Sequence, residues 1–285
     1  MSGFSLAGRV AVIATMHRKE AAIAPLITTA WNVKTLVPTD FDTDAFGTFT
    51  RDIDRASDQL TTARLKAEAA LALTGETLAL ASEGSFGPHP QLPFVPYSRE
   101  FVLLLDTVHQ LEIVGEAVST HTNYRSQAIA SLEEALSFAK SVGFPAHGLV
   151  VMESVEAPNR PLAKGITQES DLITAVELAL SNARHGKVHL ETDMRALYNP
   201  TRMQAIAQAT EDLIQRVAQR CPKCDCPGFS IVERRLGLPC GLCYAPTSLT
   251  LSELSRCQKC AYECWVRSPD APDFADPGQC PYCNP

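Results

Sequence analysis

The sequence predicts an α/β protein: a mixed sheet flanked by helices, followed by a small cysteine-rich module at the C-terminal end. Two observations support this fold class. Short apolar segments alternate with helical segments over residues 1–219, which is the pattern of a sheet covered by helices. All ten cysteines fall after position 220. We therefore expect a ligand-binding or catalytic domain over residues 1–219 and a separate module over residues 220–285.

The strands are expected where short, apolar, β-branched runs occur, and the helices where apolar residues recur at 3.6-residue spacing. Pro25 predicts a kink or an early break in the first helix, and Gly75 ends the second. Glycine and proline make residues 38–51 and 83–90 loops. Strands are predicted at 9–15, 33–37, 78–82, 101–106, 111–118, 148–154 and 187–192, and helices at 17–31, 55–73, 130–142, 168–184 and 200–219.

Composition and charge narrow the classes of function. A hydrophobic content of 45% with 20% charged residues is typical of a folded globular chain of 285 residues. The net charge is −7, with −1 in residues 221–285 and −6 in the rest, which disfavours nucleic acid and anionic membranes as partners. No apolar run approaches the roughly 18 residues of a membrane span. The N-terminus lacks the features of a secretory signal, so we expect a cytoplasmic protein without membrane contact.

Eight of the cysteines form four C-x2-C pairs, which predict two structural zinc sites of four cysteines each. Sequential pairing gives two zinc ribbons of ordinary spacing and is the preferred interpretation. A nested arrangement, with the inner pairs on one zinc and the outer pairs on the other, is the alternative. Both sites would be closed and serve the fold rather than catalysis. Cys226 and Cys264 remain as free thiols beside the sites, or as alternative ligands or redox sensors. The predicted ligands are Cys221, Cys224, Cys240, Cys243, Cys257, Cys260, Cys280 and Cys283.

Three polar loops follow predicted strands, where α/β sheets commonly present their ligand sites. In the first, Thr15 can cap the following helix while Arg18 and Lys19 face an anion, or these charges are simply solvated. The second holds Asp40, Asp42 and Asp44, three acids that either bind a divalent cation or are solvated.

The third loop begins with Glu83 at the end of a buried strand. A carboxylate is costly there unless it ligates a metal or acts as a general base. Ser85 and His89 follow it in the same loop.

A fourth polar cluster lies between the last predicted strand and the last helix. Asn199 can cap that helix, with Pro200 at its first position. Arg195 and Arg202 could clamp a phosphate or carboxylate with two hydrogen bonds each. Together with Asp193 they form either a substrate loop or an internal salt-bridge corner.

Two resemblances add to this interpretation. ATMHRKEAAIAPLI at 14–27, the helix RASDQLTTARLKAEAALALTG and the strand LALASEGSFG resemble the opening elements of the inosine triphosphate pyrophosphatase/Maf-like superfamily, over about residues 9–118. That resemblance implies that Lys19 and Lys66 contact phosphates and that Glu83 helps to hold Mg²⁺. His17 occupies the place of the usual asparagine. SEGSFGPHP, ETDMRALYNPTRM and CPYCNP resemble an uncharacterised bacterial family, named only as a domain of unknown function.

The leading hypothesis is a Mg²⁺-assisted hydrolase of a nucleotide or another small phosphorylated substrate. The alternative is a non-catalytic ligand sensor or adaptor whose zinc module binds a protein partner or nucleic acid. A transferase acting on a carboxylated substrate is a third possibility. The predicted catalytic residues are Glu83, Asp42, Asp44 and Lys19, and the predicted substrate-binding residues are Thr15, His17, Lys66, Ser85, His89, Asp193, Arg195, Asn199 and Arg202.

Overall fold

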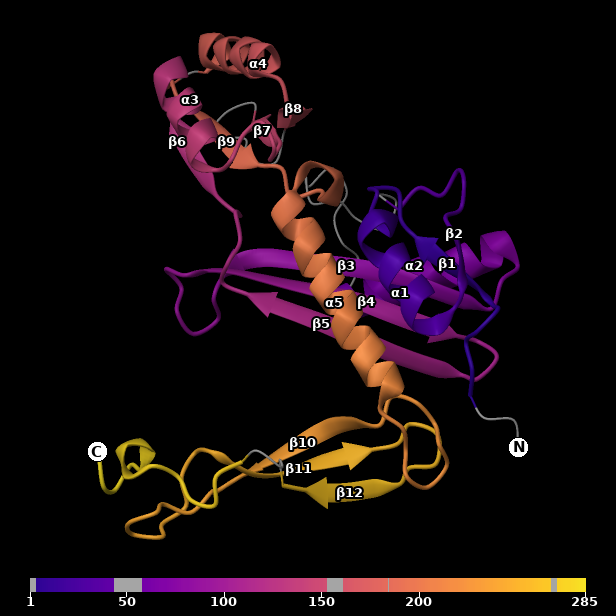
Figure 1. Cartoon of the computed structure of the whole chain (residues 1–285). Coiled ribbons are helices and arrows are strands. Elements are labelled where there is room, and N and C mark those ends of the chain that lie inside the picture. Colours follow the sequence, from indigo (N-terminus) through magenta and orange to yellow (C-terminus); the bar gives the residue numbers. More distant parts are fainter. Residues whose placement is uncertain (1–3, 44–57, 153–160, 184, 268–270) are drawn as a thin grey trace. The chain divides into compact units, whose positions relative to one another are not determined.

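The computed structural model describes residues 4–43, 58–152, 161–183, 185–267 and 271–285 (Figure 1). The chain divides into two compact units, which we describe separately. The larger unit is Leu6–Ile214, and the smaller one consists of Gln215–Pro285 with the first residues of the chain. Among the described helices, none combines the length and the apolar character that a membrane span requires.

The larger unit contains the mixed sheet that the sequence predicts. Its strand order is β2-β1-β3-β4-β5. The first three of these strands are parallel to one another, while β4 runs antiparallel to both β3 and β5. The parallel strands therefore end at one common edge, next to the loop that follows each of them. The strands are β1 (Val10–Ala14), β2 (Lys34–Leu36), β3 (Leu78–Pro88), β4 (Pro96–Asp106) and β5 (Leu111–Ser119).

Strand β3 is longer than predicted, and the expected loop at 83–90 is wrong for most of its length. Eleven consecutive pairs, from Leu78 with Asp106 to Pro88 with Pro96, join β3 to β4. This long ladder satisfies the backbone hydrogen bonds of the glycine-containing segment, so tertiary pairing overrides the local preference for a loop. Glu83 consequently lies within a strand and not in a loop.

Helices α1 (Glu20–Trp31) and α2 (Gln59–Thr74) accompany the parallel part of the sheet. Helix α1 continues through Pro25, so the expected break does not occur. The side chain of Asp58 accepts hydrogen bonds from two backbone N–H groups at the start of α2, and Gly75 ends this helix with a φ of 72°. Small residues let α2 approach the sheet closely. Its apolar core with the sheet includes Ala63, Ala67, Ala70, Ala79 and Ala81.

Helix α5 (Pro200–Ala218) packs on the antiparallel part of the same sheet at Gly115 of β5. A Cβ atom on Gly115 would lie 2.2 Å from the Ala209 carbonyl oxygen and 2.4 Å from the Leu213 nitrogen, so only glycine permits this approach. The carboxylate of Asp212 also accepts a hydrogen bond of 2.8 Å from the backbone N–H of Glu116.

A second sheet in the larger unit is entirely antiparallel, with the strand order β6-β9-β7-β8. Residues 126–129 and 161–166 supply its two edge strands, which the sequence analysis does not predict. Three of the four β6 residues are exposed, and β8 alternates partly buried and exposed residues, so neither edge strand carries a continuous apolar run. The elements are β6 (Ser126–Ile129), α3 (Leu132–Ser141), β7 (Leu149–Met152), β8 (Pro161–Ile166), α4 (Glu169–Asn182), β9 (Val188–Thr192) and the short 3-10 helix η2 (Ala196–Tyr198).

The smaller unit is built on a three-stranded antiparallel sheet in the order β10-β11-β12. Figure 1 shows the three strands of this sheet. One C-x2-C pair precedes β10, one lies between β10 and β11, one between β11 and β12, and one follows β12. The strands are β10 (Ser230–Leu236), β11 (Thr250–Arg256) and β12 (Glu263–Val266), and the 3-10 helix η3 (Pro277–Gln279) precedes the last cysteine pair.

Candidate zinc centres and ligand site

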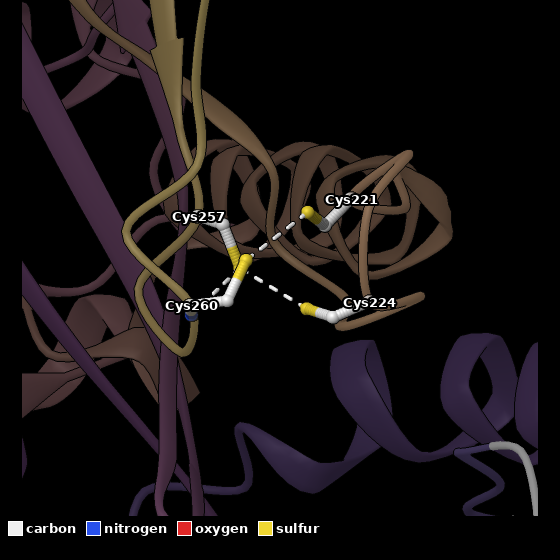
Figure 2. A group of neighbouring side chains, drawn as sticks. All are labelled: Cys221, Cys224, Cys257 and Cys260. Atoms are coloured by element: carbon white, nitrogen blue, oxygen red, sulfur yellow. Dashed lines mark hydrogen bonds between the residues drawn. The ribbon is translucent and has the colours of Figure 1, made fainter.

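Two groups of four cysteines converge in the smaller unit, and together they contain all eight predicted ligands. Within each group the four sulfur atoms lie within 4.8 Å of one another. Figure 2 shows the first group, in which two side chains from the segment before β10 face two from the segment after β11. The groups are Cys221, Cys224, Cys257 and Cys260, and Cys240, Cys243, Cys280 and Cys283.

The sulfur spacing fits zinc. Tetrahedral coordination with Zn–S bonds of about 2.3 Å places neighbouring sulfurs about 3.8 Å apart. Two sulfur–sulfur distances are 3.7 and 3.6 Å in the first group, and two are 3.8 and 3.6 Å in the second. Each group can therefore hold one structural zinc ion in a closed shell of four thiolates.

The pairing is interleaved, so the preferred sequential pairing is wrong, and so is the nested alternative. The first C-x2-C pair joins the third, and the second joins the fourth. The three-stranded meander explains this result. An antiparallel strand carries the chain from one end of the sheet to the other, so pairs separated by one strand lie at opposite ends. Pairs separated by two strands return to the same end, where they share a metal.

The backbone around the cysteine pairs adopts a repeated turn. Asp225, Tyr244 and Ala261, which follow the second cysteine of the first three pairs, have φ values of 57°, 60° and 56°. Each donates its N–H to the carbonyl of the first cysteine of its pair, at 2.9–3.0 Å. Backbone N–H groups also point at sulfur, as from Leu242 to Cys240 at 3.4 Å. This geometry aims both thiolates of a pair at one point.

The two remaining cysteines lie outside both groups. Cys226 is buried, and its sulfur lies 3.5 Å from the Pro227 carbonyl oxygen. Cys264 belongs to β12, where it pairs with Ser255 of β11. Neither cysteine replaces a ligand in the arrangement that the structure shows.

In the larger unit, a pocket of about 540 Å³ lies where the loops after β1 and β2 meet. This is the sheet edge at which the sequence predicts the first two polar loops. Asp44 lies outside the described residues. The lining includes Thr15 and Arg18 from the first loop, Glu20 at the start of α1, and Asp40, Phe41 and Asp42 from the second loop.

Two lining residues have a strained backbone. Arg18 and Asp40 both have a φ of 58°, a conformation that side chains other than glycine adopt uncommonly. The other described non-glycine residues with positive φ are explained by the fold, for example Asn32 as the C-cap of α1. Such strain costs roughly 1–3 kcal/mol and collects at functional sites. Both residues belong to the charged rim of this pocket.

The structure corrects two expectations for the first loop. Thr15 does not cap α1, because the helix begins at Glu20 and its N-cap position is occupied by Lys19. Instead, the hydroxyl oxygen of Thr15 accepts a hydrogen bond of 3.2 Å from the backbone N–H of His17. Lys19 also does not line the pocket with Arg18, since its side chain is buried beside the sheet.

Lys19 belongs to a buried cluster of five ionisable side chains beside β3 and β4. Its ammonium group donates a hydrogen bond of 2.9 Å to the carbonyl oxygen of Ser82. On β3, Glu83 forms an ion pair with Lys66 of α2. On β4, Glu100 accepts a hydrogen bond of 2.6 Å from Arg202 of α5. The cluster brings together Lys19, Lys66, Glu83, Glu100 and Arg202, all of them buried.

The cluster contains three potential cations and two carboxylates, which makes it short of negative charge. Burial, followed by the positive charges of Arg202 and Lys66, lowers the pKa of Lys19 to about 7, although Glu83 and Glu100 act in the opposite direction. Near neutral pH the Lys19 amine is thus partly deprotonated. An anion bound beside it would favour the ammonium form.

Two buried acceptors of this region have no hydrogen-bond partner among the described residues. They are the Oε2 atom of Glu100 and the hydroxyl oxygen of Ser82. The register pairs Gly84 with Glu100, and a Cβ on Gly84 would lie 2.1 Å from the Glu100 carboxylate. Neither Glu100 nor Ser82 was predicted from the sequence to belong to a site. The sequence feature that could have indicated a site residue at Glu100 is its charge, directly before the apolar run at 101–105.

The cluster around the start of α5 has an internal structure. Arg195 and Asp193 form an ion pair of 2.6 Å, and Asp193 also accepts the backbone N–H of Gly165 at 3.0 Å. Asn199 caps α5 by accepting the N–H of Arg202 at 2.9 Å, which confirms its predicted capping role. These contacts correspond to the salt-bridge corner that was one of the two predicted alternatives.

The remaining predicted ligand-binding residues have local partners. The Ser85 hydroxyl donates to the side-chain oxygen of Gln59 at 3.1 Å. His89 lies beyond the end of β3, where its ring packs edge-on against Tyr97 with centroids 5.3 Å apart. Its Nδ1 accepts the backbone N–H of Gln91 at 3.2 Å. The structure therefore does not bring Ser85 or His89 to the pocket lining.

The fold and the two cysteine groups define an α/β protein with a C-terminal module that can hold two zinc ions. A family model described as "Domain of unknown function (DUF6671)" matches residues 66–285. The chain belongs to this family, which confirms the predicted membership of an uncharacterised family. Comparisons with curated proteins and with solved structures found no match.

Proposed function

We propose that the larger unit binds a small phosphorylated molecule, such as a nucleotide, in the pocket between the loops after β1 and β2 and hydrolyses it with the help of Mg²⁺. The observation that carries the proposal is the strained, charged rim of this pocket. Arg18 and Asp40 are both held at a φ of 58° and both line it. A backbone held in this way, with side chains of opposite charge, suits a ligand that combines a phosphate with a metal ion.

The lining holds one arginine and the acids Glu20, Asp40 and Asp42, so positive charge for an anionic ligand would come from Arg18, from a bound metal ion and from the nearby buried cluster. Arg18 lines the pocket, and the following residue, Lys19, belongs to the buried cluster that holds more potential cations than carboxylates. Negative charge brought to this edge of the sheet would meet Arg18 directly and would stabilise the protonated form of Lys19. Lys66 and Glu83 pair with each other behind Lys19, and in the proposal they keep the cluster in place.

The acids of the second loop suit Mg²⁺, which prefers one or two carboxylates together with phosphate oxygens and water. Asp40 and Asp42 line the pocket and would hold the ion. When bound, the ion would neutralise phosphate charge and lower the pKa of a bound water. In the reaction, a water oxygen forms a bond to phosphorus, the bond from phosphorus to the leaving oxygen breaks, and one water proton is lost to solvent.

The test measures release of phosphate and pyrophosphate from a panel of nucleoside triphosphates with and without Mg²⁺. Asp42→Asn and Arg18→Gln should each lower turnover by about 10²-fold or more, as expected when one charge that stabilises the transition state is removed. Asp171→Asn, an exposed acid of α4, is the matched control and should retain activity. Absence of Mg²⁺-dependent turnover, or equal turnover in the Asp42 variant and the control, would refute the proposal.

A second candidate function is a ligand sensor or adaptor in which the zinc module contacts a protein partner. It is favoured by the large apolar side chains that the module exposes, among them Leu242, Tyr244 and Tyr282, each more than two-thirds exposed. In this case the pocket would bind a phosphorylated ligand without turnover. Calorimetry with a non-hydrolysable nucleotide, combined with a negative turnover assay, would distinguish the sensor from the hydrolase.

A further inference from the structure

The two cysteine groups differ in the side chains that their C-x2-C turns carry. The third residue of each C-x2-C pair lies at the turn between the two ligands. In the first zinc group this residue is Lys223 in one pair and Lys259 in the other. In the second group it is Leu242 in one pair and Tyr282 in the other. One end of the module is therefore basic, and the other is apolar.

The apolar end exposes four large side chains around the second zinc group, which we name the Leu242 surface: Leu242, Tyr244, Phe274 and Tyr282. Their exposed fractions are 68%, 68%, 48% and 73%. The rings of Tyr244 and Phe274 meet edge to face, with centroids 5.8 Å apart. A hydrogen bond of 2.9 Å from the Gly241 N–H to the Ala275 carbonyl fixes the segment of Phe274 beside the second cysteine pair.

Exposing these side chains to water is unfavourable, at about 25 cal/mol per Å² of apolar area. Single apolar side chains on a surface are ordinary, whereas several grouped around one rigid feature are typical of an interaction site. A zinc ion in the second group would supply that rigidity, because its ligands come from both turns. A rigid surface also loses little conformational entropy when a partner binds.

With zinc bound, the charge around this surface would be negative. Residues 237–249 contain no charged side chain, and Asp276 follows Phe274 after one residue. Arg267 is paired with Asp273 at 3.1 Å. Four thiolates outweigh the two positive charges of a zinc ion, so a filled second site adds further negative charge. At the first group, in contrast, Lys223 and Lys259 stand at the turns and offset the thiolates.

We propose that the Leu242 surface binds a protein segment that carries large apolar side chains beside lysine or arginine. The apolar side chains would cover Leu242 and Tyr282, and the basic ones would face the electronegative zinc group and Asp276. A nucleic acid or an anionic membrane would bring phosphate to a negative surface. A second copy of the chain would place two negative ends against each other. The charge therefore favours a basic, apolar protein segment over these alternatives.

The test uses the zinc-loaded full chain and a phage-displayed library of random 12-residue peptides. Selected peptides should combine large apolar residues with Lys or Arg. Synthesised and labelled, they should bind the double variant Leu242→Ser/Tyr282→Ser at least about tenfold more weakly than the natural chain, as is usual for central interface residues. The matched control Lys223→Ser/Lys259→Ser should bind equally well. All three proteins must retain two zinc ions, which shows that the module remains folded.

Three outcomes would overturn the proposal. One is the absence of enriched peptides, or enrichment of acidic ones. A second is equal binding of the enriched peptides to the Leu242→Ser/Tyr282→Ser variant and to the natural chain. The third is evidence for a different occupant of the surface. Such evidence would be self-association of the chain in sedimentation experiments, or binding of the chain to phosphatidylcholine vesicles, if the double variant no longer shows it. Each result concerns the zinc module alone and is independent of the turnover assay proposed for the pocket.

Discussion

The interleaved zinc sites make a prediction that only this pairing satisfies. Replacing Cys224 and Cys257 together by serine removes two ligands of the same group, so the protein should retain one zinc ion per chain. Replacing Cys224 and Cys243 together removes one ligand from each group and should reduce both sites. Sequential pairing predicts the reverse, because Cys224 and Cys243 would then share one metal. The two double variants therefore distinguish the two topologies.

The size of the effect follows from the sulfur geometry. The sulfurs of Cys224 and Cys257 lie 3.6 Å apart, close to the spacing of about 3.8 Å in a tetrahedral zinc–thiolate site. Structural zinc contributes apparent binding free energies on the order of 10 kcal/mol, so a site without two thiolates should lose its metal at micromolar zinc. Native mass spectrometry measures the stoichiometry. The control variant Cys226→Ser should keep two zinc ions. The interleaved pairing would be refuted if the Cys224/Cys257 double variant lost both ions while the Cys224/Cys243 double variant kept one.

Three further predictions concern the larger unit. Gly115→Ala should destabilise it by about 3 kcal/mol, or roughly 6–12 °C in Tm, because the new Cβ would meet a backbone atom of α5 at 2.2 Å. The control Gly87→Ala has open space around the new Cβ and should change Tm little. Equal Tm values for the two variants would refute the close packing of α5 on Gly115. The lowered pKa of Lys19, about 7, means that the unfolded chain binds more protons above that pH, so the contribution of Lys19 to stability should rise between pH 7 and 10. Lys19→Met should exceed the natural chain in free energy of unfolding, measured by urea denaturation, and this difference should shrink from pH 7 to pH 10. A difference that stays constant over that range would contradict the lowered pKa of Lys19. Burial acts to raise the pKa of Asp106, but hydrogen bonds from Arg9 and His109 outweigh it and lower the pKa. Asp106→Asn should therefore reduce the free energy of unfolding by roughly 1–3 kcal/mol at neutral pH and by less below pH 3. Equal losses of stability at both pH values would contradict this reasoning.

In the antiparallel sheet β6-β9-β7-β8, the sequence predicted the two central strands and missed the two edge strands. Residues 149–152 and 188–192 lie in the middle of the antiparallel sheet, where apolar side chains mark them as strands. Residues 126–129 and 161–166 are the two edges of that sheet and face solvent over much of their length, so their composition resembles that of loops. Pairing with a neighbour makes them strands, and a single sequence does not contain that information.

The cysteine pairing was unpredictable for a related reason. The spacing identified all eight cysteines of the two groups, because a C-x2-C turn is local. The choice of partner depends on which turns the intervening strands bring together. The strand at 230–236 is exposed at most positions, and the strand at 250–256 is mostly half-buried. Polar residues outnumber apolar ones in both, so neither carries a strong apolar signature. Without them, sequential ribbons of ordinary spacing were the natural expectation.

The burial of Glu83 is compatible with more than one role for its carboxylate. A carboxylate at the end of a buried strand does require compensation, which suggested a metal or a catalytic proton. In the structure, the ammonium group of Lys66 provides that compensation. Glu83→Gln would leave Lys66 buried without its counter-charge, a change that typically costs about 3–5 kcal/mol of stability. Loss of activity in this variant would thus be expected from unfolding as much as from chemistry, which is why Asp42 and Arg18, at the pocket rim, are the informative residues to replace.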